Sequence, residues 1–428
     1  MENFILDLLR ASGADGWTVE DERRSGWEFY FIRHALDQNR MRDVEHITLT
    51  LYKRFSEGGQ EFLGSASAGI PPTASRAEAE KLIAQLLGEA KLIRNPLYRL
   101  NEPRGEAAPI AETPDLRAIS GEFIRALRSV EESAEADINS YEIFADCVTR
   151  RFISSTGIDV TDVYPSSMTE VVVNARRGEH EIELYRMYKS GSCDAAALKA
   201  SVAETLRIGR DKLRAEKTPA LGRCDVVFST DDALEIYRYF IDRMSSNMVY
   251  RHISDFEIGK RVCEDAGGDA LTVRALRRLE NSSRNGAYDS EGAPVRDMTI
   301  IENSVAKNYF GSRMFSQYLG LEDSFIPGNI AVDGGAVSAA ELRTGKYLEI
   351  VEFSDFQVDS ASGDIAGEIR LGYLHDGDKV TVVEGGSVSG TMRELAGTMR
   401  FSRERKQYNN YLIPAVTRLC GASITGAE

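Results

Sequence analysis

The sequence predicts an α+β protein in which an N-terminal α/β domain precedes a β-rich C-terminal domain. At 428 residues the chain is longer than a single hydrophobic core usually extends, so two domains are expected. The first half mixes helix-like and strand-like segments, whereas the second half is mostly short strand-like segments separated by glycines. We expect domains over residues 1–218 and 219–428.

The first elements follow from hydrophobic periodicity. A helix is predicted over residues 3–12, because its apolar residues share one face. Three strands are predicted next, and in the second of them apolar and polar residues alternate, as on a half-buried strand. Their ranges are 27–33, 47–55 and 61–69.

Local capping signals predict the next helices. Ser75 and Glu78 have the spacing of a capping box, which opens a helix to about Leu92. The proline-containing stretch 96–112 is predicted to be an exposed linker. Thr113-Pro114-Asp115 then begins another helix, since proline is tolerated in a first turn.

Strand-like segments dominate the rest of the N-terminal domain. They cover residues 141–153, 157–164, 169–176 and 180–188, and the last two form a plausible hairpin. A helix over 194–214 ends this domain, and Pro219–Arg223 marks the boundary. Beyond it we expect a strand over 224–228, a helix over 231–245 and short strands at 347–353, 368–373 and 379–383.

Composition excludes several classes of function. The formal net charge of −15 disfavours a nucleic-acid partner. The possible exceptions are two arginine-rich clusters, which are more typical of solvated surfaces. They are Arg274, Arg277, Arg278 and Arg284, and Arg400, Arg403, Arg405 and Lys406. We expect no membrane partner, because no apolar stretch approaches the length of a membrane span.

The beginning of the chain and its cysteines indicate a cytoplasmic protein. The first residues lack the basic and apolar regions of a secretory signal. The cysteines are odd in number and scattered, which is typical of reduced thiols: Cys147, Cys193, Cys224, Cys263 and Cys420.

A set of turn-rich β segments in the C-terminal half carries a family resemblance. In order, they are Tyr288–Gly292, Ile301–Asn303, Phe353–Phe356, Ser362–Tyr373 and Gly385–Gly390. Together they resemble the C-terminal domain of the TldD/PmbA family, which is related to zinc metallopeptidases and was once called modulator of DNA gyrase. The resemblance implies a two-domain architecture and dimers that enclose a chamber.

The metal-binding motif of the catalytic branch has no counterpart here. In that branch a helix bears His-Glu-x-x-x-His, whereas the corresponding helix has Arg238 to Arg243 at about those positions. The segment matching the family's cysteine ligand is roughly Ser402 to Tyr408, without cysteine, and Cys420 lies beyond it. His252 is the histidine nearest to the site. Arginine is always protonated and cannot ligate zinc.

The resemblance therefore points to the PmbA/TldE-like branch, whose members lack the zinc site and act as non-catalytic subunits. We expect no catalytic, cofactor-binding or metal-binding residue, no cofactor, and an isolated chain inactive as a peptidase. The expected function is a pseudoenzyme subunit that pairs with a TldD-like catalytic subunit in peptide maturation and proteolysis of extended peptides. By the resemblance, the β-rich domain would orient the peptide, in one version as an added strand.

Two other hypotheses remain open. The chain could be a stand-alone homodimeric peptide-binding or scaffold protein, or a hydrolase with a relocated metal site. Carboxylates that could form an oxygen-ligand site for Mg²⁺ or Ca²⁺ are Asp289, Glu291, Glu302, Asp364 and Glu368, although their spacing is not that of an EF-hand. The glycine pairs match neither a dinucleotide-binding fingerprint nor a P-loop, and they are better explained as turns.

Overall fold

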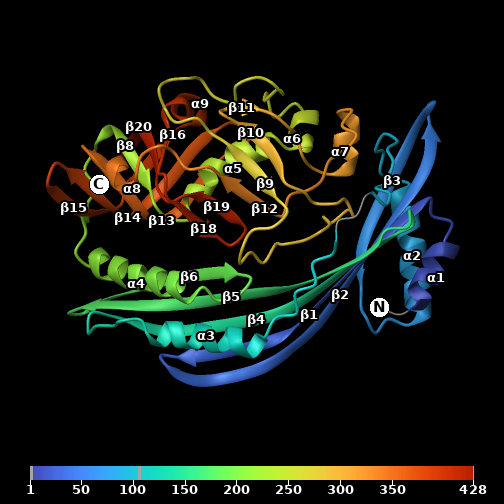
Figure 1. The fold of residues 1–428 in the computed structure, drawn as a ribbon, viewed down its shortest axis with the longest axis horizontal. Helices are drawn as coiled ribbons and strands as arrows, with labels where there is room; N and C mark the ends of the chain where they lie inside the picture. The colour runs from blue at the N-terminus through green and yellow to red at the C-terminus, as the bar shows by residue number, and fades with distance from the viewer. Residues whose placement is uncertain (1–2, 105–107, 428) are drawn as a thin grey trace.

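The chain folds into two halves that pack along a long, bent sheet. The computed structural model describes residues 3–104 and 108–427. Figure 1 shows the long N-terminal strands running beneath the C-terminal half and continuing past it to a pair of helices. The predicted α+β class, with a β-rich C-terminal half, is confirmed.

The N-terminal half is one antiparallel sheet with helices at both ends. Its strand order is β3-β2-β1-β4-β5-β6. The helices α1 and α2 pack on the end around Trp17 and Leu49, and α3 and α4 pack on the other end around Tyr141 and Val173. The strands are β1 (Gly16–Ile32), β2 (Ala35–Glu57), β3 (Gln60–Ile70), β4 (Ala136–Ser154), β5 (Asp159–Arg177) and β6 (His180–Ser190), and the helices are α1 (Asn3–Ala11), α2 (Arg76–Ala90), α3 (Leu116–Arg128) and α4 (Ala195–Lys212).

Several strands are longer than the sequence predicts. The segments at 27–33 and 47–55 cover only parts of β1 and β2, and the missed part of β1 includes the buried Trp17 and Val19. The segments at 157–164 and 169–176 form the single strand β5 and do not end at Pro165. Pro165 pairs with Cys147 of β4, whereas β6 begins to pair only at Ser167. The missing N–H of Pro165 therefore falls where β5 has no second neighbour, a position at which a strand tolerates proline.

The predicted linker is bound along part of its length. Its residues 105–107 lie outside the described residues. Before them, the Tyr318 hydroxyl donates a hydrogen bond to the Pro96 carbonyl at 2.5 Å, and the Gln317 side chain exchanges hydrogen bonds with the backbone of Arg99 at 2.5 and 3.0 Å. Residues 96–104 are thus held against α7 (Arg313–Tyr318) of the C-terminal half. A composition rich in proline did not reveal these contacts, because backbone groups make them.

The C-terminal half contains two sheets. The first has the order β11-β10-β9-β12-β19-β18. The second has the order β13-β8-β20-β16-β14-β15-β7, and β13 also pairs with β14, so the sheet curls back on itself. The strands of the first sheet are β9 (Val273–Leu276), β10 (Met298–Glu302), β11 (Val305–Ala306), β12 (Asn329–Val332), β18 (Arg405–Tyr408) and β19 (Tyr411–Pro414).

The second sheet begins just before the predicted boundary, because β7 (Glu216–Lys217) pairs with β15. Its other strands are β8 (Gly222–Phe228), β13 (Tyr347–Val358), β14 (Asp364–Asp376), β15 (Lys379–Glu384), β16 (Ser387–Thr391) and β20 (Thr417–Thr425), with β17 (Arg400–Phe401) pairing to β20. The helical segments are α5 (Ala233–Arg243), α6 (Ser246–Tyr250), α7, α8 (Ala339–Leu342), α9 (Met392–Leu395) and a 3₁₀ turn (Ala396–Thr398).

Two of the glycine pairs have different structural roles. Gly385 and Gly386 both have positive φ, 73° and 79°, in the connection from β15 to β16, as turn glycines should. At Gly335 the reason is space, since a Cβ there would lie 2.2 Å from the Phe401 carbonyl oxygen. Across the described residues, no helix has both the length and the apolar character that crossing a membrane would need.

Candidate functional site

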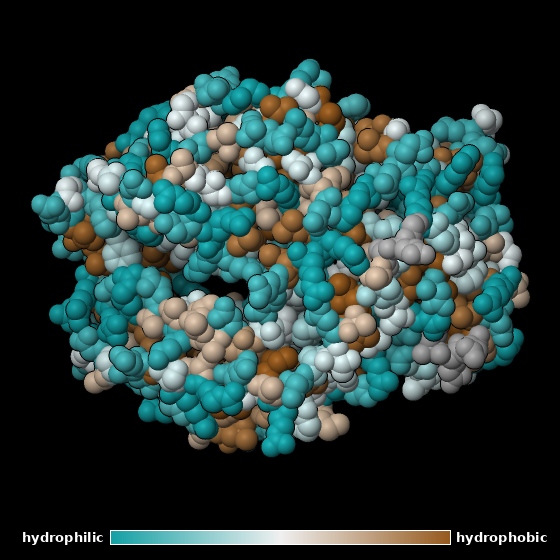
Figure 2. All heavy atoms as spheres, in the orientation of Figure 1, coloured by the Kyte–Doolittle hydropathy of each residue, from teal (hydrophilic) through white to brown (hydrophobic). Residues whose placement is uncertain are grey.

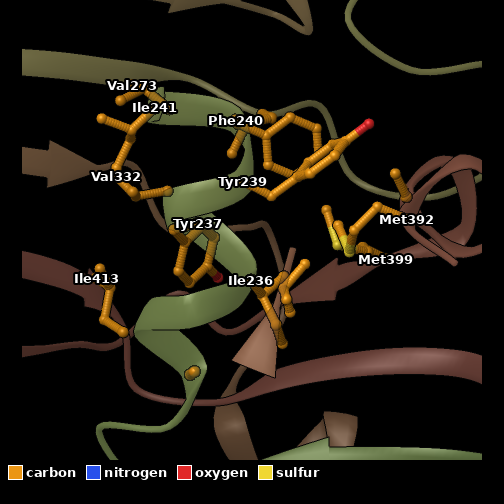
Figure 3. Packing of buried hydrophobic residues seen from close by; sticks show 14 of the residues in the cluster. Ile236, Tyr237, Tyr239, Phe240, Ile241, Val273, Val332, Met392, Met399 and Ile413 are labelled. Atoms are coloured by element: carbon orange, nitrogen blue, oxygen red, sulfur yellow. The ribbon is translucent and has the colours of Figure 1, made fainter. Parts of the chain in front are cut away.

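The helix α5 lies where the family's metal motif would be expected, and its apolar side is buried. Ile236, Tyr237 and Phe240 are fully buried in a core that also contains residues of both C-terminal sheets. Figure 3 shows this face of α5 between Val273 and Val332 on one side and Met392 and Met399 on the other. The Tyr237 hydroxyl forms a hydrogen bond with the Thr417 hydroxyl at 2.6 Å. Most of α5 is therefore core structure.

The two arginines of α5 have structural partners. The Arg238 guanidinium pairs with Glu235 at 2.5 Å and lies over the Tyr411 ring. Arg243 is buried, donates hydrogen bonds to the Ser360 and Ala361 carbonyls at 3.0 and 2.9 Å, and pairs with Asp255.

Side chains from both halves meet around the first residues of α5. Arg186 of β6 pairs with Glu352 of β13 through both guanidinium nitrogens. The Tyr188 and Thr205 hydroxyls are 3.2 Å apart on the N-terminal side. On the C-terminal side, the Tyr408 hydroxyl donates a hydrogen bond to the Ser229 carbonyl at 3.3 Å.

These side chains line a hollow between β6 and β18. Figure 2, drawn in the orientation of Figure 1, shows the surface hollowed between the C-terminal half and the layer formed by α4 and β6. We name it the β6–β18 hollow. The charged and phenolic groups that interact electrostatically between β6, the start of α5, β13 and β18 are Arg186, Tyr188, Asp231, Asp232, Glu352, Lys406 and Tyr408.

The electrostatics of the hollow are those of a partly dehydrated site. Burial raises the pKa of Asp232 to about 6, although a hydrogen bond from Thr230 acts in the opposite direction. Burial also lowers the pKa of the Lys406 ammonium and raises the pKa of the Tyr408 phenol. Desolvation disfavours the charged form in each case. Charges that remain at this place interact more strongly than in bulk water, because water is partly excluded.

Sequence reasoning did not find this group of residues. They come from β6, the start of α5, β13 and β18, so no short motif contains them. Asp231 and Asp232 do stand together in the sequence, but acidic residues ahead of a helix are common N-terminal features. Only the packing of the two halves reveals that they face β6.

Comparisons with known proteins support the family resemblance. Residues 221–426 match the family model described as PmbA/TldA metallopeptidase C-terminal domain. A curated relative, the "Metalloprotease PmbA homolog" of Haemophilus influenzae, is 23% identical over 202 residues, which are 45% of this chain and 42% of that protein. The C-terminal half of the chain belongs to the PmbA/TldD family. The sequence match thus covers less than half of the curated relative's length.

Solved PmbA/TldD-type structures share the whole fold. The crystal structure of TldE from Thermococcus kodakarensis superposes with a TM-score of 0.75 at 14% identity, covering 99% of this chain and 100% of that one. A candidate DNA gyrase modulator from Bacteroides thetaiotaomicron also gives a TM-score of 0.75, at 16% identity, covering 99% and 98% of the two chains.

The remaining family metal-site positions do not converge on a ligand set. Among the described residues, no group of three or more His, Cys, Asp or Glu side chains is arranged to hold a metal ion. His252 is exposed with a positive φ of 57° at the end of α6. Cys420 lies in β20, where burial raises the pKa of its thiol. Ser402 is buried and accepts a hydrogen bond from the Val416 N–H at 2.9 Å.

The five carboxylates considered for a Mg²⁺ or Ca²⁺ site lie in three separate segments and, among the described residues, form no common ligand group. Asp289 is buried and accepts hydrogen bonds from the backbone N–H groups of Glu291, Ala293 and Ile326 at 2.8 to 2.9 Å. Glu291 accepts one from the Arg313 N–H at 2.6 Å. Glu302 is on β10 and pairs with Lys307 at 3.0 Å, whereas Asp364 and Glu368 are on β14.

The arginine-rich clusters are largely engaged within the protein. Arg274 pairs with Asp333 at 2.8 Å, and Arg278 pairs with Glu112. Arg403 donates to the Ala336 carbonyl at 2.8 Å. The ion pairs of Arg274 and Arg278 reduce the positive charge that the first cluster presents to solvent.

Proposed function

We propose that this chain is a PmbA/TldE-like, non-catalytic subunit of a TldD/TldE-type metallopeptidase complex that processes or degrades unfolded peptides. The observation that carries the proposal is the chemistry of α5. At the family's metal position this helix has Arg238 and Arg243, both engaged in ion pairs. A guanidinium cannot replace an imidazole as a zinc ligand. Bond cleavage would then be the task of a TldD-like partner.

The proposed contribution of this subunit is to hold an extended peptide. In the described part of the chain, β6 and β18 are each one of the two outer strands of their sheets. An outer strand can accept a peptide as a further strand through backbone hydrogen bonds. The chamber of the complex, in this proposal, includes the β6–β18 hollow.

The cysteines agree with a cytoplasmic location for this complex. The five cysteines of the sequence are all free thiols. Free thiols persist where the compartment is reducing.

The decisive experiment is co-expression of this chain with a TldD-type catalytic homologue. We expect a heterodimer that copurifies, contains zinc in the partner and cleaves unfolded peptides in a chelator-sensitive way. The chain alone should cleave nothing above background. Chelator-sensitive cleavage by the purified chain, with zinc bound at about one per chain, would contradict the non-catalytic role and favour a relocated metal site.

An alternative is a stand-alone homodimeric protein that binds peptides without any proteolysis. It is favoured by one observation, namely that both outer strands of the hollow belong to the same chain, so peptide binding needs no second subunit. The same co-expression separates the two proposals. A homodimer that ignores the TldD-type protein and still binds peptides would support the alternative.

A further inference from the structure

We propose that a cavity beside the Glu112–Arg278 ion pair binds a free α-amino acid with a polar side chain, whose carboxylate and ammonium groups insert between the two charges. The inference goes beyond the proposed function, because it holds for the chain with or without a catalytic partner.

The ion pair forms a wall shared by two cavities. One has a volume of about 370 Å³, and the other, toward residues 108–111, has about 360 Å³. Cavities of this size suit a small ligand. Both halves of the molecule line the larger cavity. The side chains used below are Glu112 and Ser192 from the N-terminal half and Arg278, Glu280 and Asn281 from the C-terminal half.

The backbone on both sides of the ion pair is fixed. The Glu112 N–H donates a hydrogen bond to the Val163 carbonyl of β5 at 2.8 Å. Just after Arg278, the Leu279 N–H donates to the Asn285 side-chain oxygen at 2.9 Å, and the Asn285 amide nitrogen donates to the Leu279 carbonyl at 2.9 Å. Opening the pair therefore requires rotation of side chains alone.

The ion pair contributes little to stability, so a ligand can replace it. The Arg278 and Glu112 side chains are 61% and 36% exposed. Ion pairs with such exposure stabilise a protein by at most about 1 kcal/mol. A zwitterion compensates both charges, because its carboxylate pairs with the guanidinium and its ammonium pairs with the Glu112 carboxylate. A simple anion or cation would leave one of the two side chains without a partner.

The spacing of the two charges favours a free amino acid over a peptide. Arg278 and Glu112 are in direct contact, so the ligand's carboxylate and ammonium must also lie close together. In an α-amino acid they are attached to the same carbon atom. In a peptide they are at opposite ends of the molecule.

Polar groups in the larger cavity remain for the ligand's side chain. The Asn281 side-chain oxygen accepts hydrogen bonds from the Ser192 N–H and hydroxyl at 2.7 and 2.9 Å. Within the described part of the chain, the Asn281 amide nitrogen takes part in no hydrogen bond, and the exposed Glu280 carboxylate takes part in no hydrogen bond or ion pair. A side-chain amide offers an acceptor to Asn281 and a donor to Glu280, so glutamine suits this cavity.

Isothermal titration calorimetry on the full chain tests the zwitterion requirement without any protein variant. The probes are L-glutamine, N-acetyl-L-glutamine, L-glutaminamide and the dipeptide glycyl-L-glutamine. We expect L-glutamine to bind one to one, and about tenfold more tightly than each other probe. No binding of L-glutamine, or equal affinity for all four probes, would overturn the proposed site. Equal affinity for L-leucine and L-glutamine would overturn the preference for a polar side chain.

A variant assigns the charges. Glu112→Gln removes the partner of the ligand's ammonium, so L-glutamine should bind at most about twofold more tightly than N-acetyl-L-glutamine. The control is Asp323→Asn, which removes the acid of another exposed ion pair, with Arg296, outside the lining of the cavity. It should leave the tenfold ratio unchanged. An unchanged ratio in Glu112→Gln would overturn the role of the ion pair, and the proposed metallopeptidase complex would be unaffected.

Discussion

Arg243 shows how an arginine can be required by packing rather than by chemistry. Its side chain is 5% exposed, it donates to two carbonyls and to Asp255, and it lies over the rings of Tyr239 and Phe256 at 5.2 and 4.9 Å. Arg243→Lys keeps the charge but loses the planar fork, and should destabilise the protein by about 1–3 kcal/mol. Differential scanning calorimetry measures the effect.

The matched control for Arg243 is on the same helix. Arg238→Lys changes a side chain that is 43% exposed, and its effect should stay within about 0.5 kcal/mol. Equal effects of the two substitutions would show that burial of Arg243 does not determine its contribution.

Glu291 is a second residue whose surroundings set its behaviour. Burial raises its pKa to about 7, and the nearby Asp289 carboxylate adds to the shift, although the Arg313 N–H opposes it. A raised folded-state pKa stabilises the protein most below the unfolded value of about 4.5, and this contribution is lost as the pH rises to about 7. Glu291→Gln should therefore gain about 1–3 kcal/mol relative to the wild type between pH 4.5 and pH 8.

Urea unfolding at several pH values tests this, because the difference between variant and wild type removes the other titrating groups. Glu368→Gln, at an exposed position of β14, should show no such pH-dependent difference. A constant difference between Glu291→Gln and the wild type over this pH range would refute the shifted ionisation of Glu291.

At the scale of elements, the sequence predicted best those features that residues close together in the chain determine, such as the starts of helices. The capping box is present, with the Glu78 carboxylate accepting from the Ser75 N–H at 2.7 Å, and α2 starts where expected. Asp115 likewise caps α3. The stretch 20–25 of β1 escaped prediction because polar residues occupy both of its faces, and it separated the buried Trp17 and Val19 from the predicted strand. Its pairing, such as the Arg23–Asp43 ion pair at 2.7 Å, is a cross-strand property.

The candidate site was less predictable than the elements because it depends on contacts between segments that are far apart in the sequence. The replacement of metal-ligand types in α5 can be seen directly in the sequence. By contrast, residues from β6 and β18 are separated by about half the chain, and only the register of two sheets brings them together. Periodicity within one segment carries no information on which edge of a sheet faces another.

At the scale of the whole molecule, the two halves are joined by polar and apolar contacts. Leu184 and Ile208 pack against Val351 and Leu371, and the Tyr373 hydroxyl donates to Asp211 at 2.7 Å. Beside this cluster lies the Arg186–Glu352 pair, whose side chains are 26% and 13% exposed. Such a contact should make the two halves unfold together.

Breaking this pair should uncouple the halves. Glu352→Ala leaves the Arg186 cation partly buried without its partner, at a cost of about 2–3 kcal/mol.

Both tryptophans, Trp17 and Trp27, lie in β1, so their fluorescence follows the N-terminal half, whereas far-ultraviolet circular dichroism follows the whole chain. In the wild type the two thermal transitions should coincide. In Glu352→Ala they should separate, while the double variant Arg186→Met, Glu352→Leu should restore coincidence, because an apolar pair can replace a buried ion pair at little cost. Coincident transitions in all three proteins would mean that the apolar cluster alone couples the halves.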